Sequence, residues 1–346
     1  LWDEIRVCIP YGRPRMRWTI TLIFACLVVA GLGVSLNTKP GRPADGPVAI
    51  EAMPLVLNAS DPAQVKLGPL HYLGGWELKS RRTLFGGLSS MAIRPGGEIW
   101  ALSDGGVMFE FPEPAGHDKF IGLARVLRTA KPEKSWMPRP EDSEATAVDP
   151  DFRHVWVGYE LMQLICRYTA DLNEKGTCRA PKAMADWPET ESIESLARLP
   201  DGRFVSIAEG APGKDGGRDM LVFAGDPVEA TTPAPTRMSY MPPTGYDPTD
   251  AVYIGNGKLL VLNRRATLYD GFTAVLKLID ISHIKPGAII NGPEIARFAP
   301  PILADNLEGL ALERIGNQRI LWIVSDDNHL FLQRTLLLKF ALDDSL

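Results

Sequence analysis

Five stretches of this 346-residue chain share one pattern, and this repeat constrains the fold more than any other feature. In each copy a small or polar residue precedes an acid or a serine. An apolar alternation, a turn rich in Pro, Asp, Gly or Asn, and a second apolar alternation follow, and a charged residue ends the copy. Period-two alternation around such a turn predicts a β-hairpin. The copies are residues 87–106, 142–160, 191–210, 247–264 and 306–328.

The acid or serine that opens each copy recurs every 50 to 58 residues. That period predicts a β-propeller with one four-stranded blade per repeat. Residues 70–78 can supply the last blade's missing strand from the N-terminal side, which closes the ring and removes its free edges. We therefore expect an all-β propeller with five motif-bearing blades, and five or six in total if residues 46–80 add another. A two-sheet sandwich is the structural alternative, but it requires no such period.

The first 45 residues have a different composition. Three arginines precede 19 uncharged, mostly apolar residues, 18–36, which is long enough to cross a hydrocarbon core. The arginines predict a cytoplasmic leader (1–17) and export of the chain beyond the apolar segment. Residues 18–36 are then one hydrophobic helix, either a retained inner-membrane anchor or a cleavable signal peptide. Residues 37–47 are expected to be a linker and 48–346 the propeller. The expected location is periplasmic, anchored in the inner membrane, or secreted.

Two of the four cysteines flank a predicted strand-turn-strand. Cys166 and Cys178 could form a disulfide across this hairpin in an oxidising compartment. The alternative is a pair of buried free thiols. The chain has no Cys-x-x-Cys pair, so a structural zinc site has no support.

Charge and motifs exclude several classes of function. The net charge is −5 and the sequence pI is about 5.7, without the basic stripe of a nucleic-acid-binding protein. The chain also lacks a phosphate-binding loop, a dinucleotide fingerprint and a histidine-rich metal motif.

Hairpin geometry brings the acids together. The first residue of one strand lies opposite the last residue of the next, so the opening and closing residues of each copy share one end of a blade. Rotation about a channel then predicts a mostly anionic ring at one mouth. A single acid beside a turn is more often a solvated residue than a ligand, but here the acids recur in four of five copies. The expected pairs are Ser89 with Asp104, Glu144 with Glu160, Glu194 with Glu209, Asp250 with Arg264, and Glu308 with Asp326 and Asp327.

Crowded carboxylates repel one another unless a cation lies between them, and Ca²⁺ binds six to eight oxygen atoms. We therefore expect a Ca²⁺ site at this mouth. Arg264 is expected to act as a counter-ion or anion anchor, with Glu194 also binding substrate. The expected catalytic residues are Glu144, Glu308 and Ser89. The expected metal ligands are Asp104, Glu160, Glu209, Asp250, Asp326 and Asp327.

Two kinds of hydrolytic chemistry fit these residues. In metal-assisted hydrolysis, a cation binds a substrate oxygen while a nearby carboxylate positions water. A Ser89–His329–Asp326 triad is the alternative. Its sequence context is a β-hairpin, whereas a nucleophile elbow requires a strand-to-helix turn. The residues favour the metal-assisted reaction.

Residues 70–342 also resemble a known family. "NLEGLALE", "VSDDN" and "QRTLLLKFAL" are similar to the C-terminal signature of the phytase-like family, which is also described by an esterase-like activity of phytase. "GGLSSMAIRPGGEIWALSDGG" resembles that family's opening blade. The resemblance implies an exported propeller that hydrolyses a small ester or phosphoester. The positions carried over from the motifs are Ser89, Asp104, Glu144, Glu308, Asp326 and Asp327.

Other functions stay open because propellers carry many unrelated activities. One alternative is a non-catalytic propeller that binds a ligand or an envelope protein. Another is lactone hydrolysis on a Ca²⁺ propeller, which would need a more specific arrangement of Glu, Asn and Asp.

Overall fold

A computed structural model describes residues 44–129 and 142–346. The predicted leader, the hydrophobic segment 18–36 and most of the linker lie outside the described residues. Within the described ranges, no helix has the length and apolar character required to cross a membrane.

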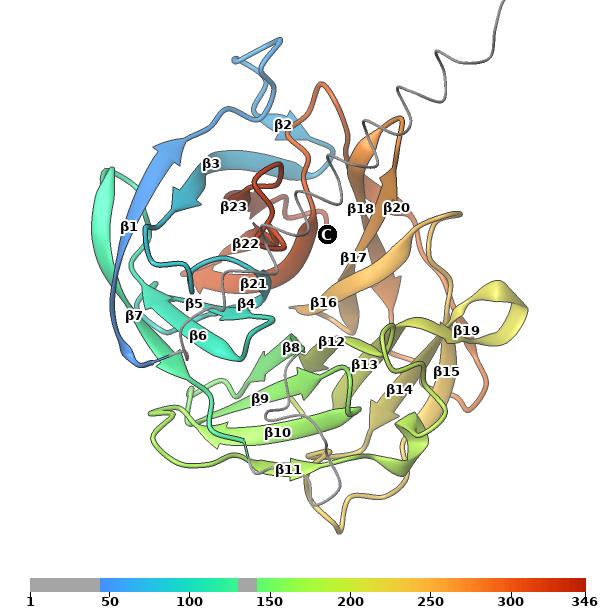
Figure 1. The fold of residues 1–346 in the computed structure, drawn as a ribbon. Coiled ribbons are helices and arrows are strands. Elements are labelled where there is room, and N and C mark those ends of the chain that lie inside the picture. Colours follow the sequence, from blue (N-terminus) through green and yellow to red (C-terminus); the bar gives the residue numbers. More distant parts are fainter. Residues whose placement is uncertain (1–43, 130–141) are drawn as a thin grey trace, which may run out of the picture. The chain divides into compact units, whose positions relative to one another are not determined.

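Five β-sheet blades surround a central axis (Figure 1). Blade 1 contains β4 (Leu88–Ile93), β5 (Ile99–Ser103), β6 (Val107–Phe111) and β7 (Lys119–Val126). Blade 2 contains β8 (Ser143–Val148), β9 (His154–Tyr159), β10 (Leu164–Thr169) and β11 (Thr177–Arg179). Blade 3 contains β12 (Ile193–Arg198), β13 (Phe204–Pro212), β14 (Arg218–Phe223) and β15 (Thr236–Tyr240), with β19 (Ile289–Ile290) parallel to β15.

The remaining two blades complete the ring. Blade 4 contains β16 (Asp247–Gly255), β17 (Lys258–Thr267), β18 (Gly271–Asp280) and β20 (Glu294–Phe298). Blade 5 contains β21 (Leu307–Ile315), β22 (Gln318–Ser325), β23 (Thr335–Leu342) and β3 (Leu70–Lys79). The short β2 (Lys66–Leu67) pairs with β3. Two 3-10 helices, η1 (Lys182–Met184) and η2 (Lys214–Gly216), lie in the loops.

The N-terminal part of the propeller closes the ring, as the sequence predicts. Strand β3 pairs antiparallel with β23 from Leu70 opposite Leu342 to Leu78 opposite Thr335. β1 (Gly46–Pro54) then bridges the outer strands of blades 5 and 1 by pairing with both β3 and β7. Residues 46–80 therefore complete blade 5 and join it to blade 1, and the described ring has five blades.

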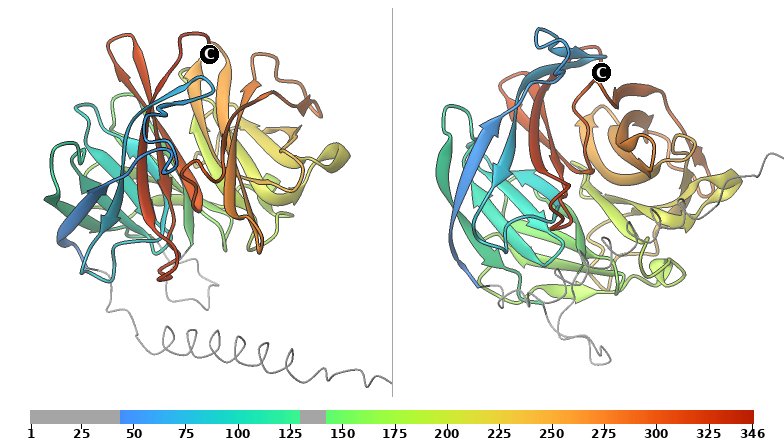
Figure 2. Two further views of the ribbon diagram at one scale, coloured as in Figure 1. Left: turned by 90° about the horizontal axis from the view of Figure 1, so that it is seen from above. Right: turned by 45° about the horizontal axis from the view of Figure 1, so that its top comes forward.

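The five inner strands β4, β8, β12, β16 and β21 contact one another in that cyclic order around the channel. Both views of Figure 2 show the blades packed side by side. Five hydrophobic clusters account for this packing, with one cluster between each pair of neighbouring blades. Successive inner-strand residues join different clusters, as Leu196 and Ala197 do, because side chains alternate between the two faces of a strand. This explains why both faces of the repeat are apolar.

A disulfide joins Cys166 on β10 to Cys178 on β11, where the two residues lie directly opposite each other. This confirms the cross-linked alternative over two free thiols. The bond ties the short outermost strand of blade 2 to the rest of the blade.

Replacing both cysteines with alanine should lower the free energy of unfolding by about 2–3 kcal/mol, because the bond closes a short loop in the unfolded chain. Urea denaturation of the purified double variant under non-reducing conditions measures this change. A thiol reductant should lower wild-type stability similarly and leave the double variant unchanged. Equal stability of wild type and double variant without reductant would contradict this expectation.

Candidate functional site

A β-bulge lies near the start of every inner strand. The ladder between the inner strand and its neighbour shifts register at the same place in all five blades. A bulge leaves an extra residue whose side chain is re-aimed, and bulges are common next to active sites. The five bulge residues are Ser89, Glu144, Glu194, Thr249 and Glu308.

The register between β16 and β17 corrects the alignment of the fourth sequence copy with the other four. The bulge residue of blade 4 is Thr249, whereas the sequence pattern places Asp250 at this position. Asp250 is 2% exposed and lies opposite Leu262. Its carboxylate accepts hydrogen bonds from the backbone N–H groups of Ala251 and Leu310, 2.7 Å away in each case. Asp250 thus joins inner strands β16 and β21, and the expected pairing of Asp250 with Arg264 does not form.

The closing residue of each hairpin lies at the same end of its blade as the bulge. The backbone N–H of Asp104 donates to the carbonyl of Gly87 at 2.8 Å, and the N–H of Glu160 donates likewise to Asp142. The corresponding bonds in the other blades place the remaining closing residues at this end. These residues are Asp104, Glu160, Glu209, Arg264 and Asp326.

Three carboxyl groups from blades 2 and 3 form a close cluster. Glu160, Glu194 and Glu209 each offer an oxygen atom, and these atoms lie within 4.8 Å of one another. Glu160 and Glu194 are buried, and Glu209 is half-buried. Carboxylates in such a group could hold a metal ion. The sequence assigns Glu194 to substrate binding, but the structure places its carboxyl group beside those of Glu160 and Glu209.

Arg264 connects this acidic triad to blade 5. One of its Nη atoms donates to Glu209 at 3.0 Å, and the other donates to Glu308 and to the side chain of Asn306. Charge–charge attraction to Glu308, Glu194 and Glu209 raises the pKa of Arg264 despite its burial. Arg264 therefore stays protonated and compensates part of the buried negative charge.

Burial raises the pKa of several acids at this mouth. It raises the pKa of Glu308 to about 8 although Arg264 opposes the shift, and it raises that of Asp326 to about 7. Burial also raises the pKa of Glu160 to about 8, opposed by a hydrogen bond from the Ser192 N–H. The pKa values of Glu144 and Glu194 rise well above the ordinary glutamate range, first from burial and then from neighbouring carboxylates. One arginine does not compensate the charge of all these groups.

Ser89 and the remaining acids of blades 1 and 5 have different surroundings. The Ser89 hydroxyl is buried and donates to the Ser143 carbonyl at 2.6 Å, and no bond to His329 is present among the described residues. His329 instead lies 3.9 Å from Asp104. Asp327 accepts bonds from the Gly87 N–H and the Thr335 hydroxyl, each at 2.9 Å, which joins blade 5 to blade 1. This geometry favours carboxylate chemistry over a serine triad.

The sequence reasoning did not single out three residues of this mouth. Asp142 raises the pKa values of Glu144 and Glu160 through its charge, and Asn306 bonds to Arg264. Thr249 is the third. The sequence spacing could have identified Thr249 as the bulge residue. Ser89 and Glu194 each lie fifteen positions before the closing residue of their copy, and Thr249 lies fifteen positions before Arg264.

The raised pKa values predict a pH-dependent stability in the absence of divalent cations. Folded Glu160 binds a proton up to about pH 8, whereas an unfolded glutamate releases it near 4.5. The free energy of unfolding should therefore fall as pH rises from 5 to 8. Glu160→Gln should make this fall smaller by about 2 kcal/mol, because it removes a carboxyl group whose pKa is raised chiefly by burial. Urea denaturation in chelator at both pH values measures the difference.

The matched control for this experiment is Glu51→Gln on the outer strand β1. Glu51 is exposed and its pKa is lowered by Lys119, so its titration lies below this pH window. If the free energy of unfolding of Glu160→Gln falls with pH as steeply as that of wild type, the electrostatic account of this mouth is wrong.

Comparisons with known proteins identify the family of this chain. No curated protein matches the chain. The major Malassezia sympodialis allergen Mala s 1 matches with a TM-score of 0.42 and 15% identity over 78% of this chain and 88% of that chain. A putative oxidoreductase (glucose dehydrogenase) of Thermus thermophilus matches with a TM-score of 0.38 and 13% identity over 73% and 97%. At these scores neither structure informs the chemistry. The family model "Phytase-like: Esterase-like activity of phytase" matches residues 83–329, and the chain belongs to the phytase-like family.

Proposed function

We propose that this protein is a metal-dependent hydrolase of small esters or phosphoesters and that Ca²⁺ is its metal. The observation that carries the proposal is the acidic triad of Glu160, Glu194 and Glu209 directly beside Arg264. A cation site next to a fixed guanidinium suits a substrate that carries negative charge or develops it during the reaction. The family description, an esterase-like activity of phytase, supports the same reaction class.

The donor set of the triad fits a hard divalent cation. Three carboxylates offer up to six oxygen atoms, and Ca²⁺ takes six to eight. Ligands on opposite sides of one Ca²⁺ lie about 4.6–5.2 Å apart, twice the Ca–O distance, and neighbouring ligands lie closer, so three oxygen atoms within 4.8 Å of one another can share one ion. Bound Ca²⁺ would polarise a carbonyl or phosphoryl oxygen and would favour the ionised form of the three acids.

Arg264 is proposed to orient the substrate. Among the residues that the structure describes, its hydrogen bonds go to Asn306, Glu308 and Glu209. A guanidinium has five N–H donors, so capacity remains for a phosphoryl or carboxyl oxygen. Because three partners hold the side chain in place, it can bind a substrate anion with little additional loss of conformational freedom.

Glu308 and Glu144 are proposed to handle protons. Both are bulge residues whose ordinary pKa is raised by burial, and the pKa of Glu308 is about 8. A carboxyl group that titrates near neutral pH, as that of Glu308 does, can accept a proton from attacking water and return it to the leaving oxygen. Ser89 is not the proposed nucleophile, because its hydroxyl already donates to the Ser143 carbonyl.

We also propose that the propeller is exported and that residues 18–36 direct the export. The Cys166–Cys178 disulfide supports this location, since such bonds form and persist in oxidising compartments. The retained anchor and the cleaved signal peptide both place the propeller outside the cytoplasm.

Hydrolysis of an aryl ester and an aryl phosphate by the purified protein tests the proposed function. Activity should require Ca²⁺ and disappear in excess chelator. Glu308→Gln should lower kcat roughly a hundredfold and leave Ca²⁺ affinity nearly unchanged, because it removes a proton-transfer group outside the triad. Glu194→Gln should instead weaken Ca²⁺ binding, measured by calorimetry.

The exposed Glu51→Gln variant, which also loses one carboxylate, should keep wild-type kcat and Ca²⁺ affinity. A protein that binds no Ca²⁺ and hydrolyses neither substrate would refute the proposal and favour the non-catalytic alternative. Ca²⁺ binding without hydrolysis would retain the metal site and refute the reaction.

A further inference from the structure

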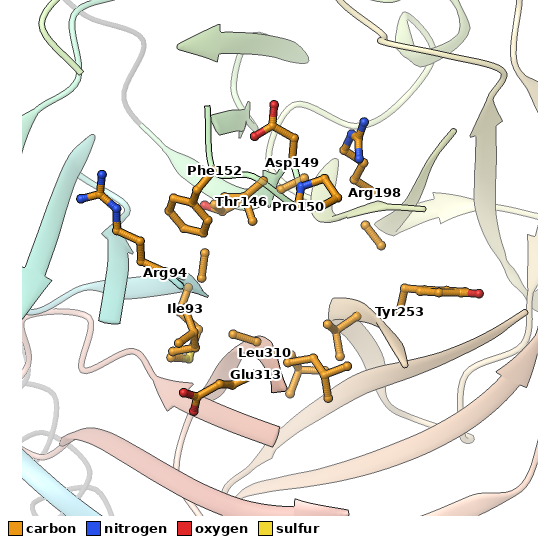
Figure 3. A pocket seen from close by; sticks show the side chains of 18 of the residues that line it. Ile93, Arg94, Thr146, Asp149, Pro150, Phe152, Arg198, Tyr253, Leu310 and Glu313 are labelled. Atoms are coloured by element: carbon orange, nitrogen blue, oxygen red, sulfur yellow. The ribbon is translucent and has the colours of Figure 1, made fainter. Parts of the chain in front are cut away.

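A second cavity lies at the other end of the channel. Its volume is about 470 Å³, and residues from all five inner strands line it together with the turns that follow β4, β8 and β12. The bulge residues of the acidic mouth precede these residues on the same strands, so the two sites open at opposite ends. Figure 3 shows the cavity with Ile93 and Leu310 in its wall and the polar ends of Arg94 and Arg198 directed away from its centre.

A collar of five buried side chains lies between the bulge residues and the far ends of the inner strands. One residue comes from each inner strand, two positions beyond the bulge residue, and each is at most 8% exposed. Four of the five are apolar. The residues are Met91, Thr146, Leu196, Ala251 and Leu310. The volume and the mostly apolar lining are those of a small-molecule pocket.

The charged residues at this cavity leave positive charge available. Arg198 lies 5.8 Å from the centre of the Trp156 ring, and no hydrogen bond or ion pair engages its guanidinium among the described residues. Arg314 donates to the Ile254 carbonyl at 3.0 Å.

The two acids of the cavity are already engaged. The Asp149 carboxylate accepts from the backbone N–H groups of Arg153 and His154, and its second oxygen lies 3.0 Å from the His154 ring. Glu313 accepts from the Trp322 indole at 2.9 Å. An organic anion could therefore bind Arg198 without displacing an existing carboxylate.

The collar contains one unused polar group. The Thr146 hydroxyl is buried and has no hydrogen-bond partner in the described part of the chain. Leaving a hydroxyl buried without a partner costs about 1–3 kcal/mol, so a partner is expected. Thr146 lines the cavity, and a bound oxygen atom could supply that partner if binding turns the hydroxyl, which is buried in the free protein, toward it.

We propose that this cavity binds an amphipathic organic anion, with its carboxylate at Arg198 away from the cavity centre, its apolar body against the cavity wall, and an oxygen atom at Thr146. The apolar body excludes simple inorganic anions as good ligands. The site does not use the acids of the hydrolase mouth, because it consists of the collar residue Thr146 and of residues further along the inner strands.

Calorimetry of the purified protein with 10-hydroxydecanoate tests the proposal. We expect saturable binding that is stronger than for decanoate, which lacks the terminal oxygen, and none for acetate, which lacks the apolar body. Arg198→Met should weaken binding at least about tenfold through loss of the charged partner. Thr146→Val should remove the preference for 10-hydroxydecanoate over decanoate and raise the Tm of the free protein, since it removes the unpaired hydroxyl.

Two controls separate this site from the rest of the molecule. Leu312→Trp fills the cavity and should abolish binding, and circular dichroism checks that this variant folds. Glu194→Gln at the other mouth should bind 10-hydroxydecanoate as wild type does. The proposal fails if wild type shows no saturable binding, if Arg198→Met binds as tightly as wild type, or if Glu194→Gln loses binding. If Leu312→Trp does not fold, Arg198→Met and Thr146→Val decide the outcome.

Discussion

The ladder between β3 and β23 joins the two ends of the propeller, and the geometry of the ring depends on it. Without β3, the last blade would expose the edge of β23 and β1 could not bridge to blade 1. The Trp76 and Trp322 rings stack 6.4 Å apart beneath this ladder and anchor it in the core. Closure holds five inner strands around one axis, and so it holds the five bulges at one mouth.

Because the five bulges converge, several carboxyl groups are buried close together, and this destabilises the folded protein when the groups are ionised. Removal from water and mutual repulsion both disfavour ionised carboxylates there, and the pKa values of Glu160 and Glu308 rise accordingly. Arg264 reduces this cost by bonding to Glu209 and Glu308. A cation at the triad would reduce it further. Strongly perturbed pKa values of this kind cluster at functional sites.

The two ends of the channel differ because residue types change along each inner strand. Bulge residues are mostly acidic, whereas the residues two positions further on are mostly apolar and pack between the blades. The lining of the channel therefore changes at the collar around Thr146 from a charged mouth to an apolar cavity, although the same five strands build both. The five inner strands thus line two chemically distinct regions, the acidic mouth and the apolar cavity.

The sequence by itself determined much of this protein. The 50–58-residue period predicted the blades, the apolar alternation predicted the hairpins within them, and residues 70–78 predicted the closing strand. These features are local or periodic, so a single chain reveals them. The tertiary structure alone placed Thr249 rather than Asp250 at the fourth bulge, because a one-residue shift in register leaves the pattern of residue types almost unchanged. It also decided that Glu194 joins Glu160 and Glu209 and that Arg264 reaches both Glu209 and Glu308. Those contacts cross between blades, and their distances depend on how the blades pack around the axis.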